Sequence, residues 1–480
     1  MASAQRPVRG NRTLHGLLTI LLMAALLVPG ASVARLAGPQ QGAPVIKTRD
    51  LAQIRSSQIL RVLVNQSRNS SGKVKGQPVG VEYHRLQALE HALNAHARAG
   101  QAVRLKIIPR AKEQLLGALL RGEGDIAAPG ELLDPALVKG LVASEPVVDQ
   151  VSLQLVGRKG GRSFTRVEQL SGRTIALTSA SAAGPVLREV NARLARHKRA
   201  PIKIEWVDPS LAVEDVLEMV QAGIYPLTVV ERPIARRWAR VMPRLQLQTR
   251  LKLAPARPMR WYLRKDAPAL QGVVNGFLRN YRPPANQDAV FERIYKRQYR
   301  IHDPLAQRRR LESVRPVLQK HARAQQMDWL SLAALAFKES TLNPAAAGTS
   351  GGAHGLMQIT PSAARRVGVR NTATVDGNVK ASARYLALIR RKFFASPQLN
   401  ERERMAFILA AYNLGPERVQ AMRAEARRRG LNGNQWFFQT ERIAMEQVGM
   451  GPVNYVNSVN KYYLAFNRER GKLERTTRRR

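Results

Sequence analysis

The first half of the chain alternates short apolar runs with longer stretches whose apolar residues recur every three or four positions. Short runs rich in Val, Ile and Leu are typical of buried strands, and the longer spacing is typical of amphipathic helices. We expect strands at 60–64, 103–108, 125–128, 174–177, 202–207 and 227–230, and helices at 83–97, 114–120, 183–194 and 213–222. Such alternation predicts βαβ units around mostly parallel sheets. Two successive sets predict a two-lobed α/β domain over residues 57–299, with lobe two at about 150–253 and lobe one resuming over 254–299.

The second half of the chain carries almost no strand signal after residue 311. Residues 378–394 have one apolar face, and residues 405–414 are apolar almost all round, which predicts a buried central helix that ends at Gly415. Pro452 is suited to the first turn of a last helix, whose apolar face includes Tyr455. We therefore predict an all-α domain over residues 316–468, preceded by a charged linker at 300–315 and followed by a basic tail at 469–480.

The N-terminus has the layout of a secretory signal. Three arginines precede an apolar run at 17–28, and small residues follow at 31–34. The run is shorter than the roughly 20 residues of a membrane-spanning helix, so we predict a signal peptide over 1–34 and a polar linker over 35–56. The expected compartment is the periplasm; a free protein and one held peripherally at the outer membrane both remain open.

The composition of the chain limits the classes of partner that we expect. The chain has 480 residues with 78 Lys and Arg against 34 Asp and Glu, a formal net charge of +44, which favours polyanions such as nucleic acid, anionic lipid or the carboxylate-bearing peptides of a cell wall. The export signal excludes nucleic acid as the expected partner. The chain has no cysteine, so disulfides and thiolate catalysis are excluded. We expect no cofactor and no metal, because His354 has no second histidine at ligand spacing.

The stretch 329–359 places one carboxylate on an apolar helix face. Asp328 is a plausible N-cap, and the stripe that starts at Trp329 next reaches Glu339, shortly before Asn343 and Pro344 end the helix. A carboxyl group that is partly desolvated near the negative end of the helix dipole should have a raised pKa, as a general acid requires. The alternative is an ordinary glutamate that faces solvent or pairs with an arginine.

Glu339 belongs to an ordered set of short motifs. Ser340 follows it, the Gly-Leu-Met-Gln sequence lies at 355–358, Ala-Tyr-Asn-Leu-Gly lies at 411–415, and Tyr455 comes later. In this order and spacing the set resembles the lysozyme-like lytic transglycosylases that cleave peptidoglycan. The first half resembles the amino-acid-type periplasmic solute-binding proteins (family 3), through landmarks such as 120–126 and 291–295. The expected fold class is therefore multidomain, an α/β periplasmic-binding-protein-like domain followed by an all-α lysozyme-like domain.

The resemblance implies a carbon–oxygen lyase acting on peptidoglycan glycan strands. Glu339 would protonate the β-1,4 oxygen between N-acetylmuramic acid and N-acetylglucosamine and then deprotonate the C6 hydroxyl, which gives a 1,6-anhydro product. Asp376 is the only other acid between 348 and 397, so the sequence offers no convincing second carboxylate. A hydrolytic muramidase remains an alternative, as does a solute- or glycan-binding sensor with an inactive lysozyme-like domain.

The resemblance also implies the binding residues. They are Ser340, Met357, Gln358, Tyr412, Asn413 and Tyr455. Ser340 has the alternative of bonding a helix carbonyl, Met357 of plain packing and Tyr455 of a core position. In the solute-binding half, ligand-binding members hold the ligand with an Arg and an Asp, where this chain offers Lys139 and Glu231. The ligand expected there is an amino acid or a muropeptide, in a possibly regulatory domain.

Overall fold

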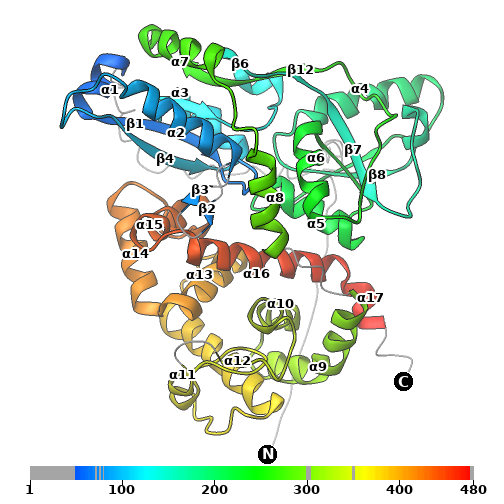
Figure 1. Ribbon diagram of the computed structural model, residues 1–480. Helices are drawn as coiled ribbons and strands as arrows, with labels where there is room; N and C mark the ends of the chain where they lie inside the picture. Colours follow the sequence, from blue (N-terminus) through cyan, green and yellow to red (C-terminus); the bar gives the residue numbers. More distant parts are fainter. Residues whose placement is uncertain are drawn as a thin grey trace, which may run out of the picture. The chain divides into compact units, whose positions relative to one another are not determined.

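The computed structural model describes residues 49–70, 73–74, 77–78, 80–298, 304–348 and 352–475 (Figure 1). These residues belong to one compact unit, Lys47–Arg480. The predicted signal peptide at 1–34 lies outside the described residues. Among the helices within them, none has both the length and the apolar character needed to cross a membrane.

Lobe one is built on a five-stranded sheet with the strand order β4-β1-β5-β12-β6. β1 pairs in parallel with β4 and β5, whereas β12 runs antiparallel to β5 and β6. Side chains such as Leu60, Val62 and Trp261 fill the core beneath the helices. The bounds are β1 (Ile59–Asn65), β4 (Arg104–Arg110), β5 (Ile126–Ala128), β6 (Leu141–Val151), β12 (Arg257–Arg264), α1 (Leu51–Ser57), α2 (Val81–Leu93), α3 (Leu115–Leu120) and α7 (Pro268–Asn280), with a separate ribbon of β2 (Lys73–Val74) and β3 (Gln77–Pro78).

Lobe two has a second five-stranded sheet, in the order β11-β7-β10-β8-β9. Its parallel strands β8, β9 and β10 come from the predicted second set of elements. The bounds are β7 (Leu153–Arg158), β8 (Thr174–Leu177), β9 (Lys203–Trp206), β10 (Leu227–Glu231), β11 (Leu245–Leu247), α4 (Ala183–Arg196), α5 (Val213–Ala222) and α6 (Arg232–Val241). Three short helical turns, Lys112–Gln114, Pro135–Val138 and Val167–Leu170, connect elements of the two lobes.

One segment belongs to a different lobe than predicted. The chain was expected to complete lobe one over 254–299, and α7 does so, but α8 (Gln287–Gln298) packs against α6 of lobe two. Phe291 and Tyr295 of α8 place their rings 5.0 and 5.2 Å from the ring of Trp238. α8 packs on lobe two because this buries the three aromatic side chains together.

The second half is helical, as predicted. Helix α10 has Leu330, Leu332, Leu335 and Ala336 fully buried in the core, where it packs against α9 and α16. The bounds are α9 (Pro304–Ala324), α10 (Trp329–Ser340), α11 (Pro361–Arg366), α12 (Val375–Phe393), α13 (Glu401–Leu414), α14 (Pro416–Arg428), a π-helical segment (Trp436–Thr440), α15 (Glu441–Gln447), α16 (Met450–Arg468) and α17 (Arg470–Arg475).

Two predicted linkers and the predicted basic tail contain helices. The linker at 35–56 ends in α1, because Asp50 caps this helix and also accepts hydrogen bonds from the amides of Ala269 and Leu270. The linker at 300–315 contains the first half of α9, and the basic tail at 469–480 begins with α17. The last long helix starts at Met450 rather than Pro452, because a proline is tolerated within a first turn.

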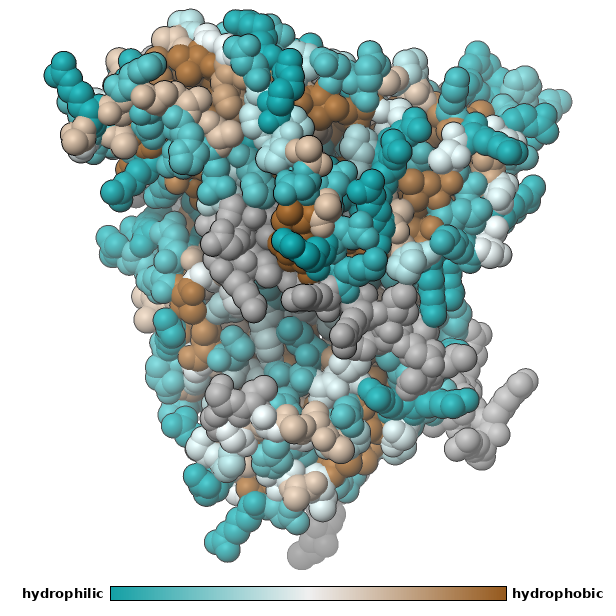
Figure 2. Space-filling model, viewed as in Figure 1, coloured by the Kyte–Doolittle hydropathy of each residue, from teal (hydrophilic) through white to brown (hydrophobic). Residues whose placement is uncertain are grey.

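Helix α16 also contacts lobe two. Lys461 Nζ lies 2.6 Å from Glu218 Oε2 and 3.4 Å from Asp215 Oδ1, and Asn460 donates to Ser210 Oγ over 2.8 Å. Arg468 pairs with Glu205 at 2.7 Å. On the face in Figure 2, hydrophilic residues predominate and hydrophobic side chains form separate patches.

Candidate active site

Helix α10 carries Glu339 in its last turn, where the apolar pattern placed it. Asp328 caps the helix by accepting from the Leu330 amide over 3.1 Å. At the other end Thr341 adopts a left-handed conformation with φ 55°, which stops the helix one residue after Ser340. The carboxylate therefore lies at the end of a helix whose opposite face is fixed in the core.

The side chain of Glu339 is half-buried and has one direct partner. The hydroxyl of Tyr455, a residue that is 7% exposed, donates a hydrogen bond to Glu339 Oε1. Burial raises the pKa of Glu339; the hydrogen bond from Tyr455 and the ammonium of Lys338 lower it, and the net shift is upward. The group thus keeps its proton to a higher pH than a free glutamate.

Hydrogen bonds join the sequence motifs to one another. Ser340 Oγ contacts the carbonyl oxygen of Leu356 at 2.8 Å and that of Ala336 at 3.1 Å. Tyr412 donates to the carbonyl oxygen of Met357 over 2.9 Å. The Glu-Ser, Gly-Leu-Met-Gln and Ala-Tyr-Asn motifs therefore form one connected site. The bond from Ser340 to a carbonyl is the alternative that the sequence left open for it.

The loop between these motifs depends on Asn378, which sequence reasoning missed. Its Oδ1 accepts from the Met357 amide over 2.9 Å, and its Nδ2 donates to the carbonyl oxygens of His354 and Thr372 over 3.0 and 3.2 Å. Gly355 has φ 74°, and a Cβ there would lie 2.6 Å from Nδ2 of Asn378. A buried asparagine at the first position of the predicted helix 378–394 was the available signal.

Gln358 and Asn413 retain polar atoms that are open to a ligand. Gln358 has φ 45° and donates to the carbonyl oxygen of Gly355 over 3.0 Å, which leaves its side-chain oxygen available. Asn413 is exposed near the end of α13, and its side chain forms no hydrogen bond within the part of the chain that the structure describes. Neither residue forms a hydrogen bond with Glu339. Met357 is fully buried behind the loop.

Asp376 is paired with two basic side chains. Its Oδ1 lies 2.7 Å from Lys320 Nζ and 2.9 Å from His321 Nε2, at the start of α12. Hydrogen bonds from these two side chains lower the pKa of Asp376. His354 is likewise engaged structurally, since its ring nitrogens contact the carbonyl oxygen of Gly352 and the hydroxyl of Thr372. Across the described ranges, no cluster of three or more His, Cys, Asp or Glu side chains is arranged to hold a metal ion.

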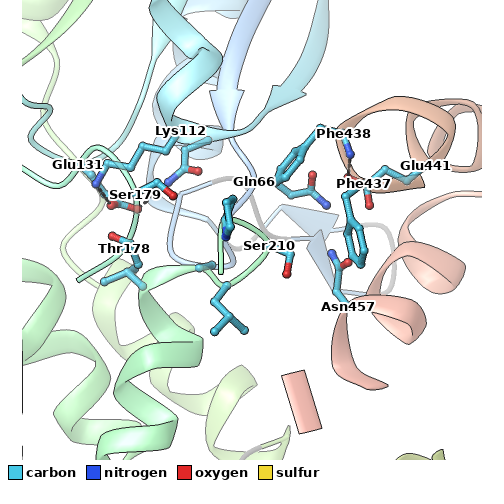
Figure 3. Close-up of a pocket in the computed structure, with 15 residues that line it drawn as sticks. Gln66, Lys112, Glu131, Thr178, Ser179, Ser210, Phe437, Phe438, Glu441 and Asn457 are labelled. Atoms are coloured by element: carbon cyan, nitrogen blue, oxygen red, sulfur yellow. Dashed lines mark hydrogen bonds and ion pairs between the residues drawn. The ribbon is translucent and has the colours of Figure 1, made fainter. Parts of the chain in front are cut away.

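A second polar site lies between the lobes and the helical region (Figure 3). Its labelled residues come from lobe one, from lobe two and from the segment around α15 and α16: Gln66, Lys112, Glu131, Thr178, Ser179, Ser210, Phe437, Phe438, Glu441 and Asn457. Lys112 Nζ lies 2.6 Å from Glu131 Oε2, and Asn65 donates to the other oxygen over 2.7 Å. Burial lowers the pKa of Lys112, but Glu131 and Glu231 raise it, and the net shift is upward.

The two residues at which this half departs from the solute-binding pattern lie in different settings. Lys139 is exposed, and the buried cation of the interlobe site is Lys112, which follows strand β4. Glu231 is buried at the start of α6, where it accepts from the Leu132 amide over 2.7 Å. Burial raises the pKa of Glu231 against the lowering effect of Lys112. Lys112 escaped prediction because its partners are distant in sequence.

Comparison with known proteins identifies one domain and a set of relatives. Residues 316–435 match the family model of the transglycosylase SLT domain. The chain is 27% identical over 403 residues to a membrane-bound lytic murein transglycosylase F of Desulfosudis oleivorans, covering 81% of this chain and 82% of the relative. A protein of the same name from Pseudomonas putida strain GB-1 is 25% identical over 446 residues, covering 88% and 87%.

Solved structures resemble the first half of the chain. An ancestral arginine-binding protein bound to arginine covers 50% of this chain and 97% of its own, with 18% identity and a TM-score of 0.39. The ancestral amino-acid-binding protein AncCDT-1 covers 51% and 98%, with 19% identity and a TM-score of 0.41. The first half is a two-lobed α/β region with one five-stranded sheet in each lobe, and residues 316–435 of the helical second half match the SLT domain model.

Proposed function

We propose that this chain, which carries a transglycosylase SLT domain, is a peptidoglycan lytic transglycosylase with Glu339 as its single acid and base. One observation carries the proposal: the carboxyl group of Glu339 is half-buried, has a raised pKa and is held by Tyr455. The side chains that shift its pKa are Tyr455 and Lys338, and neither is a carboxylate. A single acid in such a setting suits a reaction in which the sugar supplies its own nucleophile.

The proposed reaction does not use water as a reactant. Protonated Glu339 gives its proton to the β-1,4 oxygen that joins N-acetylmuramic acid to N-acetylglucosamine, and the bond from that oxygen to C1 breaks. The acetamido oxygen of the muramic acid residue stabilises the positive charge at C1. The Glu339 carboxylate then takes the proton of the C6 hydroxyl as O6 bonds to C1, which closes a 1,6-anhydro ring and restores the acid.

The surrounding residues have two kinds of role in this proposal. Gln358 and Asn413 offer amide groups to the N-acetyl and hydroxyl groups of the glycan. Ser340 and Tyr412 position the loop through the carbonyl oxygens of Leu356 and Met357. Met357 supports this loop from the core.

We assign the two lobes a non-catalytic, regulatory role, with an amino acid or a muropeptide as the ligand class. This assignment follows the resemblance of the first half to solute-binding proteins, since the interlobe site itself has a volume of only about 20 Å³. We place the protein in the periplasm, which the signal-like N-terminus supports, and at the outer membrane peripherally, in keeping with the membrane-bound proteins named among its relatives.

Mass spectrometry of peptidoglycan digests tests the proposed activity. The wild-type protein should release muropeptides with anhydro ends, and Glu339→Gln should lower release by a factor on the order of 1,000 with an unchanged circular dichroism spectrum. Glu417→Gln, an exposed glutamate of α14, is the matched control and should retain activity. Products with reducing ends would indicate a hydrolytic muramidase instead, and binding without cleavage would indicate a sensor.

A further inference from the structure

A large groove lies between strand β4 of lobe one and helices α15 and α16. Its volume is about 1200 Å³, above the range of roughly 300–1,000 Å³ that is usual for small-molecule sites. Leu105 to Pro109 of β4 form one wall, and residues of α15 and α16 form another. The size suits an extended ligand better than a single amino acid.

Three cations that line this groove form no close ion pair, although Glu123 and Glu446 lie near Arg442 and Glu339 lies near Lys338. Lys106, Lys338 and Arg442 form no ion pair within the residues that the structure describes. Burial lowers the pKa of Arg442 to about 10, so this side chain is still charged at neutral pH. Cations without a close carboxylate attract an anionic ligand.

The carboxylates of the groove are already neutralised. Glu214 and Asp215 pair with Arg68, at 3.2 Å in the case of Glu214, and Glu446 pairs with Arg429. The unbalanced charge in the groove is therefore positive, which excludes a cationic ligand and favours one with several carboxylates.

Two backbone features add to this preference. Helix α16 begins at the groove, where Gly449, Met450 and Gly451 line it, and no side chain caps this helix end. The positive end of the dipole of a 19-residue helix thus faces the groove. Strand β4 is at the edge of its sheet, and edge strands offer backbone groups to an extended peptide.

The groove extends to the residues next to the proposed acid. Lys338 lines the groove directly before Glu339, and its Nζ lies 5.9 Å from the ring centroid of Tyr455. Asn454, which precedes Tyr455, also lines the groove. A ligand in the groove therefore lies beside the position where the glycan would be cleaved.

We propose that this basic groove binds the carboxylate-bearing peptide stems of the peptidoglycan strand whose glycan is cleaved at Glu339. The inference rests on the proposed function and adds a substrate requirement to it: the preferred substrate carries peptides, and lobe one helps to hold them. The stems branch from the muramic acid residue, so a glycan bound at Glu339 brings a stem to the end of the groove that Lys338 and Asn454 form.

The test uses binding and cleavage as separate readouts. The variant is Lys106→Glu with Arg442→Glu; Lys338 is left intact because it adjoins Glu339. The matched control is Lys203→Glu with Arg418→Glu, an exposed lysine on edge strand β9 and an exposed arginine on α14. Isothermal titration calorimetry of the full chain with a soluble acidic stem peptide should show binding that weakens about tenfold or more in the groove variant and is unchanged in the control.

Cleavage rates supply the second readout. The groove variant should lose about tenfold in kcat/KM on stem-bearing strands and nothing on glycan strands stripped of peptide. Equal binding by the groove variant and the wild type would overturn the inference, as would equally tight binding of a single-stranded oligonucleotide or of anionic lipid vesicles. Peptide binding that depends on the groove in a protein without lytic activity would refute the proposed function while leaving the peptide site in place.

Discussion

The hydroxyl of Tyr455 donates a hydrogen bond to Oε1 of Glu339, and this contact joins helix α16 to the last turn of helix α10. The two residues are separated by 116 positions in the chain. The bond fixes the direction in which the carboxyl group points and stabilises its ionised form. Both effects can be measured separately.

Replacement of Tyr455 by phenylalanine should affect both rate and pH dependence. The lost hydrogen bond to a charged group should lower kcat/KM by about tenfold or more. Because Tyr455 lowers the pKa of Glu339, its loss should raise that pKa further. Activity of a general acid falls as the pH rises through its pKa, so this fall should move to higher pH, which a pH profile of kcat/KM measures.

Tyr463→Phe is the control for this prediction. Tyr463 lies on the same helix and donates to Asp328 over 3.1 Å, also a tyrosine–carboxylate bond. Its replacement should leave the pH profile unchanged. A shifted profile in both variants, or in neither, would contradict a specific role for Tyr455.

Replacement of Gly355 by alanine should destabilise the loop. The left-handed conformation alone costs an alanine about 1–2 kcal/mol. The added Cβ would also lie 2.6 Å from Asn378, whose side chain holds the Met357 amide. Gly368→Ala separates the two effects, because Gly368 has φ 71° and open space around it. Thermal unfolding should show a greater loss of stability for Gly355→Ala than for Gly368→Ala. Equal losses would show that the side chain of Asn378 moves aside without cost.

Glu441 should make stability depend on pH. Its carboxylate is 1% exposed, and burial, with Glu403 as a further contributor, raises its pKa from 4.5 to about 8. The contribution of this group to the free energy of unfolding is fully present below about pH 4.5 and is lost as the pH rises to about 8. The loss amounts to at most roughly 5 kcal/mol. Glu441→Gln should therefore unfold at a higher temperature than wild type at pH 8, with a smaller difference at pH 4.5. The exposed variant Glu417→Gln should show no such pH-dependent gain.

Removal of the ammonium group of Lys461 should be costly. This side chain is 6% exposed between Glu218 and Asp215 of lobe two. Lys461→Met leaves Glu218 without its cation, whereas Asp215 keeps its pair with Arg68, and loss of this partly buried pair should cost about 1–3 kcal/mol. Lys296→Met removes an exposed pair with Glu292 and should cost less than about 1 kcal/mol. Similar unfolding midpoints for the two variants in denaturant would contradict this account.

The sequence predicted those features that depend on local pattern. Glu339 was the polar exception in an apolar stripe, and the strands at 174–177 and the helix at 213–222 have the predicted bounds. Tyr455, which the order of the motifs singled out, lies at the site and contacts Glu339.

Features that depend on distant contacts were not predictable in this way. Lys112 meets Glu231 across more than 100 positions, and no periodicity encodes that approach. Helix α8 joins lobe two because its aromatic residues meet Trp238, which only the folded chain brings near. Helix α1 looked like part of a polar linker because the amides that tie its cap residue Asp50 to lobe one lie more than 200 residues further along the chain.

Tyr455 and Lys461 lie on one unbroken helix, α16. They are six positions apart, about 9 Å along the axis at 1.5 Å per residue, and an intact helix cannot change that spacing. A shift of lobe two that draws Lys461 along would therefore displace the hydroxyl that steers Glu339 by a similar amount. Because α16 is continuous between the two residues, a displacement at Lys461 is transmitted to Tyr455 and is not absorbed by a break in the helix.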